Sequence, residues 1–286
     1  YRPVTMHSSE ALLTNKICFS SANYYDDPFD TFLHIDIDDI RKEHLASFQT
    51  REGTEAVVAV VQKMYDKVLP EEQMKIFNAD NFPEILPDIT AKFISFALAL
   101  RDGVKKDTWS VCFSENGFNE ALWLKYADRY RGFVQIYDLE KIENYWNGGM
   151  GKGASLYPIY YSDDPYDATG FAKIILLKML EEIPGVQVPQ ELHGCFGNGA
   201  WERERTTLIK KKCHEYDEEW RMISDSRVQP PNMEWIPSGI ILGLRMETDE
   251  EKLVISAAKA AGIRNIYKSF IDSKNMLNAV QIKLDI

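Results

Sequence analysis

Apolar residues recur every three or four positions through much of the first half of the chain. Three segments show this spacing most clearly: DIDDIRKEHLASFQ (36–49), GTEAVVAVVQKMYDKVL (53–69) and PDITAKFISFALALRD (87–102). An apolar stripe with this period is typical of helices that pack through one side. The block from about 37 to 103 is therefore predicted to be a helical insertion.

The rest of the chain is richer in short runs with the two-residue period of β-strands. TWSVCFSEN (108–116) places Trp109, Val111 and Phe113 on one face, for example. Further strand-like runs lie at 16–20, 132–138, 155–162, 218–224, 238–246, 264–271 and 278–286, and helical patterns lie at 8–15, 118–132, 168–183 and 249–262. This order predicts a single α+β domain over 1–286, with a mixed or antiparallel sheet core and the helical insertion.

Charge narrows the choice of partner. The 286 residues carry a formal net charge of −11, and the basic run IKKKCH (209–214) is short enough to be a solvated face. Binding of extended nucleic acid needs a clustered basic surface, so we do not expect it. A small nucleotide held by a few arginines remains open, and nothing in the sequence predicts a protein partner.

Cysteine usage and hydropathy favour a cytoplasmic protein without a membrane partner. Cys18, Cys112, Cys195 and Cys213 are far apart and form no metal-binding pair, so reduced thiols are expected. The apolar run AKFISFALAL (91–100) is shorter than the roughly 20 residues of a membrane helix.

Several catalytic motifs are excluded by their context. GGMGKGAS (148–155) lacks a serine or threonine directly after its lysine, and GCFGNGA (194–200) follows no predicted strand, so both are interpreted as loops. No His-Glu-x-x-His helix or Cys/His cluster is present, and no metal is expected. Ser114 lies outside any nucleophile-elbow motif.

Two charged or aromatic stretches remain. In HEYDEEWRMIS (214–224), strand alternation would put Asp217, Glu219 and Arg221 on one face, which either meets solvent or lines a polar cleft. In LWLKYADRYRG (122–132), Trp123, Tyr126 and Tyr130 recur at helical spacing, which favours aromatic core packing over ligand binding.

These stretches resemble four ordered motifs of a bacterial family known as domain of unknown function 2971. YYDDPFD (24–30) is similar to its F-N-D-P-F-[DE] loop, and VCFSEN (111–116) leads to LWLKYADRYRG, which is similar to L-W-x-x-Y-A-x-x-H-x-G. HEYDEEWRMI (214–223) resembles W-x-Y-E-x-E-W-R-x-I, and IPSGIILG (236–243) follows it. The chain departs from these motifs at Asp26, Tyr130, His214 and Asp217, so a reaction that needs the family's histidine as a base would lose it here.

The motif order also resembles that of ADP-ribosyltransferase-like domains, which cleave NAD at the nicotinamide–ribose bond. The resemblance implies an arginine near the start, hydroxyl or aromatic residues in the middle, and a late strand that begins at a glutamate. The residues of this chain that fit those places are Tyr1, Arg2, Ser20, Ser114, Tyr126, Asp217 and Glu219. A role in bacterial defence against phage would suit such a family.

The roles follow from the chemistry that the resemblance implies. Glu219 would stabilise the oxocarbenium-like ribose, and Asp217 would activate the incoming nucleophile. Arg2 or Arg221 would pair with the pyrophosphate of NAD, because a guanidinium fork matches two oxygens.

Tyr126 or Trp123 would stack on the cationic nicotinamide ring. The acceptor stays open between protein, nucleic-acid end, small molecule and water.

Two other classes of function compete with this one. In a non-catalytic regulatory or ligand-binding domain, Asp217, Glu219 and Arg221 would form a structural ion-pair network that holds the 24–30 loop against the sheet. Glu219 and Arg221 would then lie within bonding distance of each other or of that loop, with no cavity. In a metal-dependent hydrolase, the three aspartates of the 24–30 loop (Asp26, Asp27 and Asp30) would join Glu219 around a cation.

Overall fold

The computed structural model describes residues 1–47, 51, 54–55, 58–59, 82–139, 154–172, 205–224 and 232–283. Four predicted features lie wholly or partly outside this range. They are the helix at 53–69 (apart from four residues), both glycine loops (apart from residues 154–155), Cys195, and the helix at 168–183 beyond residue 172. Within the described residues, none of the helices is both long and apolar enough to cross a bilayer.

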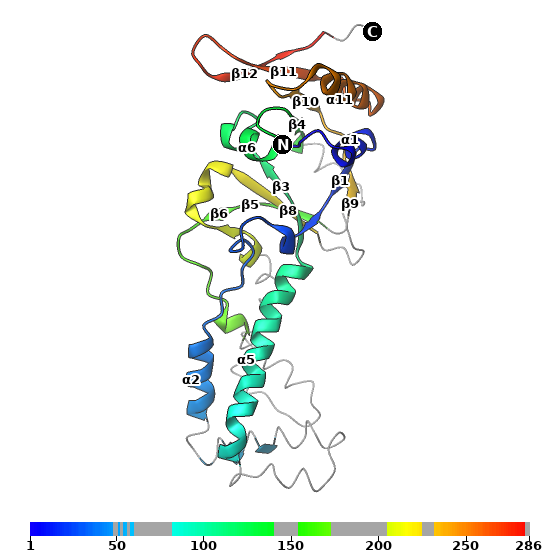
Figure 1. Cartoon of the computed structure of the whole chain (residues 1–286). Coiled ribbons are helices and arrows are strands. Elements are labelled where there is room, and N and C mark those ends of the chain that lie inside the picture. Colours follow the sequence, from blue (N-terminus) through cyan, green and yellow to red (C-terminus); the bar gives the residue numbers. More distant parts are fainter. Residues whose placement is uncertain are drawn as a thin grey trace. The chain divides into compact units, whose positions relative to one another are not determined.

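Helices and strands are interspersed along the chain (Figure 1). The α-helices are α1 (Met6–Leu13), α2 (Ile37–Ser47), α5 (Phe82–Asp107), α6 (Glu120–Tyr126) and α11 (Thr248–Ala260), and the 3-10 helices are η1 (Ala22–Tyr24) and η3 (Lys212–Asp217). The strands are β1 (Lys16–Cys18), β2 (Ser20–Ser21), β3 (Trp109–Ser114), β4 (Phe133–Ile136), β5 (Ala154–Pro158), β6 (Tyr160–Tyr161), β7 (Ile209–Lys210), β8 (Glu219–Ser224), β9 (Asn232–Glu234), β10 (Gly239–Leu242), β11 (Ile266–Ile271) and β12 (Leu277–Gln281).

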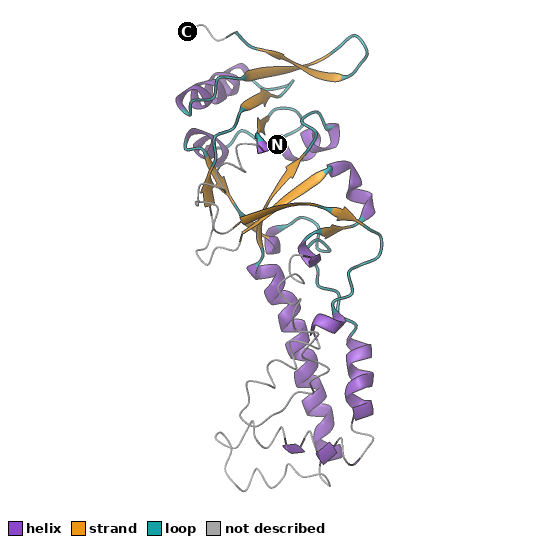
Figure 2. Ribbon diagram, turned by 180° about the vertical axis from the view of Figure 1, so that it is seen from behind, coloured by secondary structure: helices purple, strands orange, loops and turns teal. Residues whose placement is uncertain are grey.

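The chain forms two compact units, each built from separate segments. Unit 1 comprises residues 1–24, 109–161 and 210–286, and unit 2 comprises residues 25–108 and 162–209. Nearly all strands belong to unit 1, whereas the described part of unit 2 is mainly helical (Figure 2). The predicted insertion at 37–103 lies in unit 2, which also takes in 162–209.

The first four-stranded sheet of unit 1 has the order β12-β11-β10-β4. β10 pairs antiparallel with β4 and parallel with β11, and α11 provides the crossover between β10 and β11. One face carries Phe133, Ile240 and Leu242, which pack with Leu12 of α1 and Val254 of α11. Alternation along the strands turns Val134 and Ile241 to the opposite face, where they pack with Trp123 of α6.

The second four-stranded sheet of unit 1, in the order β2-β3-β8-β5, is antiparallel throughout. Its apolar face carries Val111 of β3, Met222 of β8 and Leu156 of β5, which pack with Ile17 and Phe19. The register places the alternate residues of the same strands on the other face, which is polar. This polar face carries the candidate site.

Unit 2 contains a small core between helices α2 and α5. Ile40, Ala97 and Ala172 are buried together there. The hydroxyl of Thr169 accepts a hydrogen bond of 2.7 Å from the backbone N–H of Asp36, just before α2. Helix α5 begins at Phe82 and carries Pro87 inside it, whereas the sequence pattern predicted a start at that proline.

The predicted class, α+β with mostly antiparallel sheets, is confirmed. Several predicted elements end earlier or begin later than the pattern indicated, and the backbone explains two of these differences. The helix predicted over 118–132 ends at Tyr126, because Asp128, Arg129 and Tyr130 adopt positive φ angles. The strand predicted from 218 begins at Glu219, because Glu218 is left-handed, with a φ of 46°.

Candidate functional site

Strand β8 positions the central residues of the site, because it lies between β3 and β5. Glu219 pairs in register with Ser114 of β3, and Arg221 pairs with Cys112 of β3 and with Tyr157 of β5. All five side chains therefore emerge on the polar face of the sheet.

Asp217 reaches the same place by a different route from the one predicted. It is the last residue of η3, and Glu218, left-handed at the helix C-cap, turns the chain into β8. The strand alternation that was expected to align Asp217 with Glu219 is therefore wrong, since Asp217 precedes the strand. A turn, and not a shared strand face, brings the two carboxylates together.

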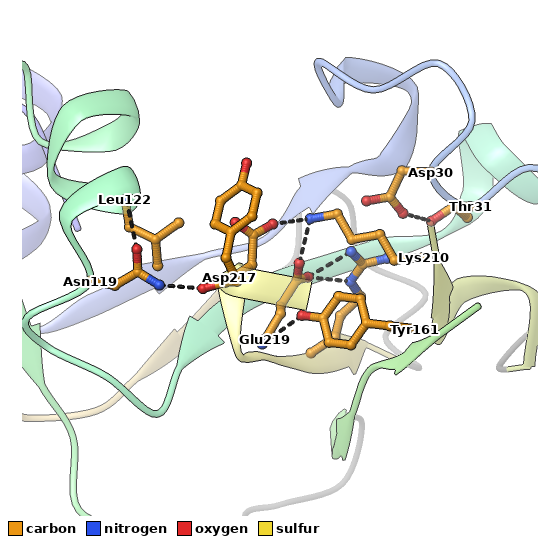
Figure 3. Close-up of polar contacts among 10 residues, drawn as sticks. Asp30, Thr31, Asn119, Leu122, Tyr161, Lys210, Asp217 and Glu219 are labelled. Carbon is orange, nitrogen blue, oxygen red and sulfur yellow. Dashed lines mark hydrogen bonds and ion pairs between the residues drawn. The ribbon is translucent and has the colours of Figure 1, made fainter. Parts of the chain in front are cut away.

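Lys210 of β7 joins the two carboxylates (Figure 3). Its ammonium donates to Asp217 Oδ2 at 2.5 Å and to Glu219 Oε2 at 2.8 Å. Arg221 donates to Glu219 Oε1 from Nε at 2.9 Å and from Nη2 at 2.6 Å. The side chains are 7% (Lys210), 6% (Asp217), 6% (Glu219) and 0% (Arg221) exposed, so two cations and two anions neutralise each other out of solvent. We call these four residues the charge network.

Mutual pairing decides which forms of these groups exist at neutral pH. Burial alone would raise the pKa of Glu219, but the charges of Arg221 and Lys210 outweigh it and lower the pKa from 4.5 to about 2. Burial alone would lower the pKa of Lys210, yet the charge of Glu219 and the hydrogen bonds to both carboxylates raise it above its ordinary value. At neutral pH, Glu219 is therefore ionised and Lys210 is protonated.

Two tyrosines border the charge network. The hydroxyl of Tyr161 accepts a hydrogen bond of 2.8 Å from the backbone N–H of Glu219, and burial with the nearby Glu219 charge raises its pKa to about 12. Tyr126, at the end of α6, is 38% exposed. Burial of its phenol raises its pKa, the neighbouring Lys125 opposes this rise, and the charges of Lys210 and Asp217 have smaller effects. Both phenols therefore stay protonated and can donate.

Among the described residues, one oxygen of the network has no hydrogen-bond partner. Oδ1 of Asp217 is buried and accepts no hydrogen bond, while its Oδ2 is held by Lys210. An unsatisfied buried carboxylate oxygen costs about 1–3 kcal/mol, so it marks a place where a donor is missing.

The thiol of Cys112 is the solvent-exposed neighbour of the network. It donates a hydrogen bond to Glu219, and the side chain is exposed although Arg221, directly opposite on β8, is fully buried. The polar face is thus reached by solvent at β3.

The aromatic residues predicted to bind the cofactor separate into two groups. Trp123 is fully buried, stacks on Tyr130 at 5.8 Å and 6°, meets the edge of Tyr1 at 5.6 Å, and donates from its indole nitrogen to the carbonyl of Gly117. The structure therefore places Trp123 in the core, as aromatic packing predicted. Tyr126, the last residue of α6, is 38% exposed and is the aromatic residue nearer to the network.

The remaining predicted residues lie around the network or away from it. Tyr1 donates its hydroxyl hydrogen to the carbonyl of Asn116 and accepts from the backbone of Asn119, in the loop that follows β3. Arg2 pairs through its backbone with Phe133, and in the described part of the chain it makes no ion pair with the network.

Ser114 is opposite Glu219, and its hydroxyl accepts from the backbone N–H of Asn116. Ser20 is exposed on the edge strand β2, where it pairs with Ser110.

The two competing readings made different geometric predictions. The structural reading predicted Glu219 and Arg221 within bonding distance, and this contact is confirmed. The hydrolase reading predicted oxygens around a cation, but in the described residues no group of three histidines, cysteines or carboxylates could hold a metal. Within the 24–30 loop, Asp27 accepts from the backbone of Phe29, and Asp30 accepts from the hydroxyl of Thr31.

Lys210, Tyr161 and Cys112 were not predicted as site residues. Lys210 is one of three consecutive lysines, and the other two, Lys211 and Lys212, are exposed. Residue type alone could not show which of the three lysines is buried in the network, because this depends on the pairing of β7 with β6.

Compared with known proteins, the chain gives no match to a protein-family model, to a curated protein or to a solved structure.

Proposed function

We propose that this chain is an ADP-ribosyltransferase-like enzyme that cleaves NAD at the bond between nicotinamide and ribose, with Glu219 as the group that stabilises the transition state. The observation that carries the proposal is the state of Glu219. It is a buried carboxylate fixed as an anion at the start of a strand, in the position that the motif order assigns to the transferase glutamate. Departure of nicotinamide creates positive charge on the ribose, and a fixed anion is worth most where charge develops.

The neighbours of Glu219 supply the other requirements of this chemistry. Asp217 has one oxygen free of hydrogen bonds, which suits a group that accepts a proton from an incoming nucleophile. Tyr126 is a half-exposed ring whose centroid lies 4.8 Å from the Lys125 ammonium, and in this proposal the cationic nicotinamide contacts the ring in place of Lys125. Arg221 is bound to Glu219 through Nε and Nη2, so its role in this proposal is to hold Glu219 and not to bind pyrophosphate.

A second candidate function is a non-catalytic ligand-binding or regulatory domain in which the charge network is structural. The specific observation that favours it is the mutual pairing of all four charges, since Lys210 and Arg221 already occupy both oxygens of Glu219. Buried networks of this kind also occur purely to satisfy one another.

The test is incubation of the purified chain with NAD, with and without cell extract as a source of acceptors, while free nicotinamide is followed by chromatography. Glu219→Gln removes the anion at constant shape, and Glu215→Gln removes an exposed glutamate of η3 as the matched control. Lys210→Met combined with Glu219→Gln removes one positive and one negative charge together, so it removes the Glu219 anion without creating an excess of buried positive charge.

We expect release by the wild type and by Glu215→Gln, and a loss of about 100-fold in both variants that lack Glu219, the size typical of losing one electrostatic stabiliser. Circular dichroism at the assay temperature establishes that each variant is folded. Absence of release from the wild type under both conditions would overturn the proposal, and so would wild-type rates in the folded double variant. Either result would favour the non-catalytic domain.

A further inference from the structure

The ammonium of Lys210 occupies a position that is built to receive a cation. It lies between the carboxylates of Asp217 and Glu219, each within hydrogen-bonding distance, and these carboxylates come from two separate elements, η3 and β8. Asp217 keeps a second buried oxygen, Oδ1, without a partner. The carboxylate oxygens of Asp217 and Glu219 can therefore accept more hydrogen bonds than Lys210 donates to them.

We propose that Asp217 and Glu219 form a binding subsite for the positively charged group of a small organic ligand, and that Lys210 occupies this subsite as a displaceable internal cation when the ligand is absent. The ligand's cation takes the place of the Lys210 ammonium, and Asp217 Oδ1 accepts a hydrogen bond from a donor group beside that charge.

Charge balance requires that one cation replaces the other. With Lys210 and Arg221 present, two positive and two negative charges cancel. If Lys210 withdraws, one negative charge among these four residues remains uncompensated in a buried place, which is unfavourable unless a ligand supplies the missing positive charge.

Lys210, and not Arg221, is the cation that can exchange. Arg221 sits inside strand β8, is fully buried, and binds one oxygen of Glu219 through both Nε and Nη2. Lys210 belongs to a strand of two residues, and a flexible four-carbon stem carries its ammonium. Withdrawal of this stem frees one oxygen on each carboxylate and leaves the Arg221 pair intact.

The walls of the subsite indicate the class of ligand. Tyr161 lies beside the subsite, because its hydroxyl accepts a hydrogen bond of 2.8 Å from the backbone N–H of Glu219. Tyr126 ends α6, the helix that Asn119 links to Tyr216 next to Asp217. Aromatic walls beside carboxylates suit an organic cation, such as an alkylammonium or a pyridinium ring. A small hard cation such as Mg²⁺ prefers about six oxygens, and the subsite provides two carboxylates.

Lys210, as the internal cation, also sets the affinity of the subsite for its ligand. If Lys210 occupies the subsite in about 99 of 100 molecules, the apparent dissociation constant of a ligand is about 100-fold higher than its intrinsic value. The inference deepens the proposed function, because NAD carries a pyridinium ring, and it rests on that function only for the choice of probe. Binding is measured without turnover, so failure of one proposal is distinguishable from failure of the other.

The direct test is NMR of the wild-type chain labelled with ¹⁵N in its lysine side chains. A buried, ion-paired ammonium exchanges its protons slowly, so Lys210 should give a signal, identified by its absence in Lys210→Met. Addition of the 1-methylnicotinamide cation should shift or abolish this signal, whereas neutral nicotinamide should leave it unchanged. An unchanged Lys210 signal up to the solubility limit of the cation would overturn the proposal.

A variant provides an independent measurement. Lys210→Met removes the internal cation at similar length, and calorimetry should show at least about tenfold tighter binding of 1-methylnicotinamide than to the wild type. Lys212→Met, which removes an exposed lysine of η3, should bind like the wild type. Equal affinity in Lys210→Met and wild type, or an equal gain for neutral nicotinamide, would contradict the exchange. The NMR test on the wild type decides the matter if Lys210→Met does not fold.

Discussion

Two cations stabilise the buried charge of Glu219, and Glu219 in turn stabilises theirs. Lys210 binds its Oε2 and Arg221 its Oε1, and all three side chains are buried. In such a network, removal of one member leaves its partners charged and without compensation, which costs more than the intact network contributes.

Replacement of Glu219 by glutamine should therefore destabilise unit 1. The variant leaves Lys210 and Arg221 with Asp217 as the remaining anion of the network, and loss of one partner in a buried pair typically lowers the free energy of unfolding by about 3–5 kcal/mol. Urea denaturation measures this change. Glu215→Gln, on the exposed side of η3, should alter the free energy of unfolding by less than about 0.5 kcal/mol. Equal stability of the two variants would show that the network does not hold the fold.

Acid should weaken the wild type through the same residue. The pKa of Glu219 is about 2 in the folded chain and 4.5 in its ordinary state. Because the folded pKa is the lower one, the stabilisation is complete above about pH 4.5 and is lost as the pH falls towards 2. The full difference corresponds to about 3 kcal/mol.

Urea midpoints measured from pH 6 down to pH 3 should fall more steeply for the wild type than for Glu219→Gln. Parallel curves for the two proteins would contradict the assignment of this pKa.

The residue types of the network were partly predictable. Asp217, Glu219 and Arg221 stood out in the sequence because three charges flank an apolar run. Lys210 did not, since its neighbours Lys211 and Lys212 have the same charge and differ only in the direction that β7 gives them. Trp123 and Tyr126 shared a helical face in the pattern, but the helix ends at Tyr126 and positive φ angles fold Tyr130 back onto Trp123.

Among the elements, α6 and η3 are tied together by one side chain. Asn119 is the N-cap of α6, where its carbonyl oxygen accepts from the backbone N–H of Leu122 at 3.2 Å, and its amide donates to the carbonyl of Tyr216 in η3. Asp217 is the next residue of η3, so this contact helps to position the unsatisfied carboxylate (Figure 3).

Two substitutions at Asn119 separate these roles. Asn119→Ala removes the cap and the link to η3, and should lower the free energy of unfolding by about 1–2 kcal/mol. Asn119→Asp keeps the capping oxygen and loses the amide, so it should recover part of that loss. Urea denaturation of both variants makes the comparison, and an aspartate variant no more stable than the alanine variant would show that the cap contributes nothing.

Element types were more predictable than element ends. The two-residue period located β3 and β8, because each has one apolar face on a core, whereas β10 is apolar on both faces. The start of β8 was missed because left-handed Glu218 has no signature in residue type. The apolar pattern also gives no information on which strands pair, so the parallel contact of β10 with β11 was unpredictable.

For the whole molecule, net charge makes the clearest prediction. A chain with a net charge of −11 repels phosphates at long range, and no basic face was predicted. Labelled single- and double-stranded oligonucleotides should show no anisotropy change at physiological salt and protein concentrations up to about 100 μM, the range in which basic proteins bind non-specifically. Binding that weakens steeply with added salt would contradict this expectation.

The division into two units was beyond the reach of the sequence. Unit 2 is built from 25–108 and 162–209, and the two segments meet where His34 bridges to Asp167 and Ala172 packs in the core of α2 and α5. The helical period of 37–103 was visible, but the second segment carries no signal that assigns it to the same unit.

The central claim is that Glu219 is an anion held between Lys210 and Arg221. NMR of the chain labelled with ¹³C in glutamate carboxyl groups tests it most directly, with the Glu219 signal identified by its absence in Glu219→Gln. We predict a carboxylate that is still ionised at pH 3, in agreement with a pKa of about 2. A Glu219 signal that titrates near its ordinary pKa of 4.5 would contradict the account.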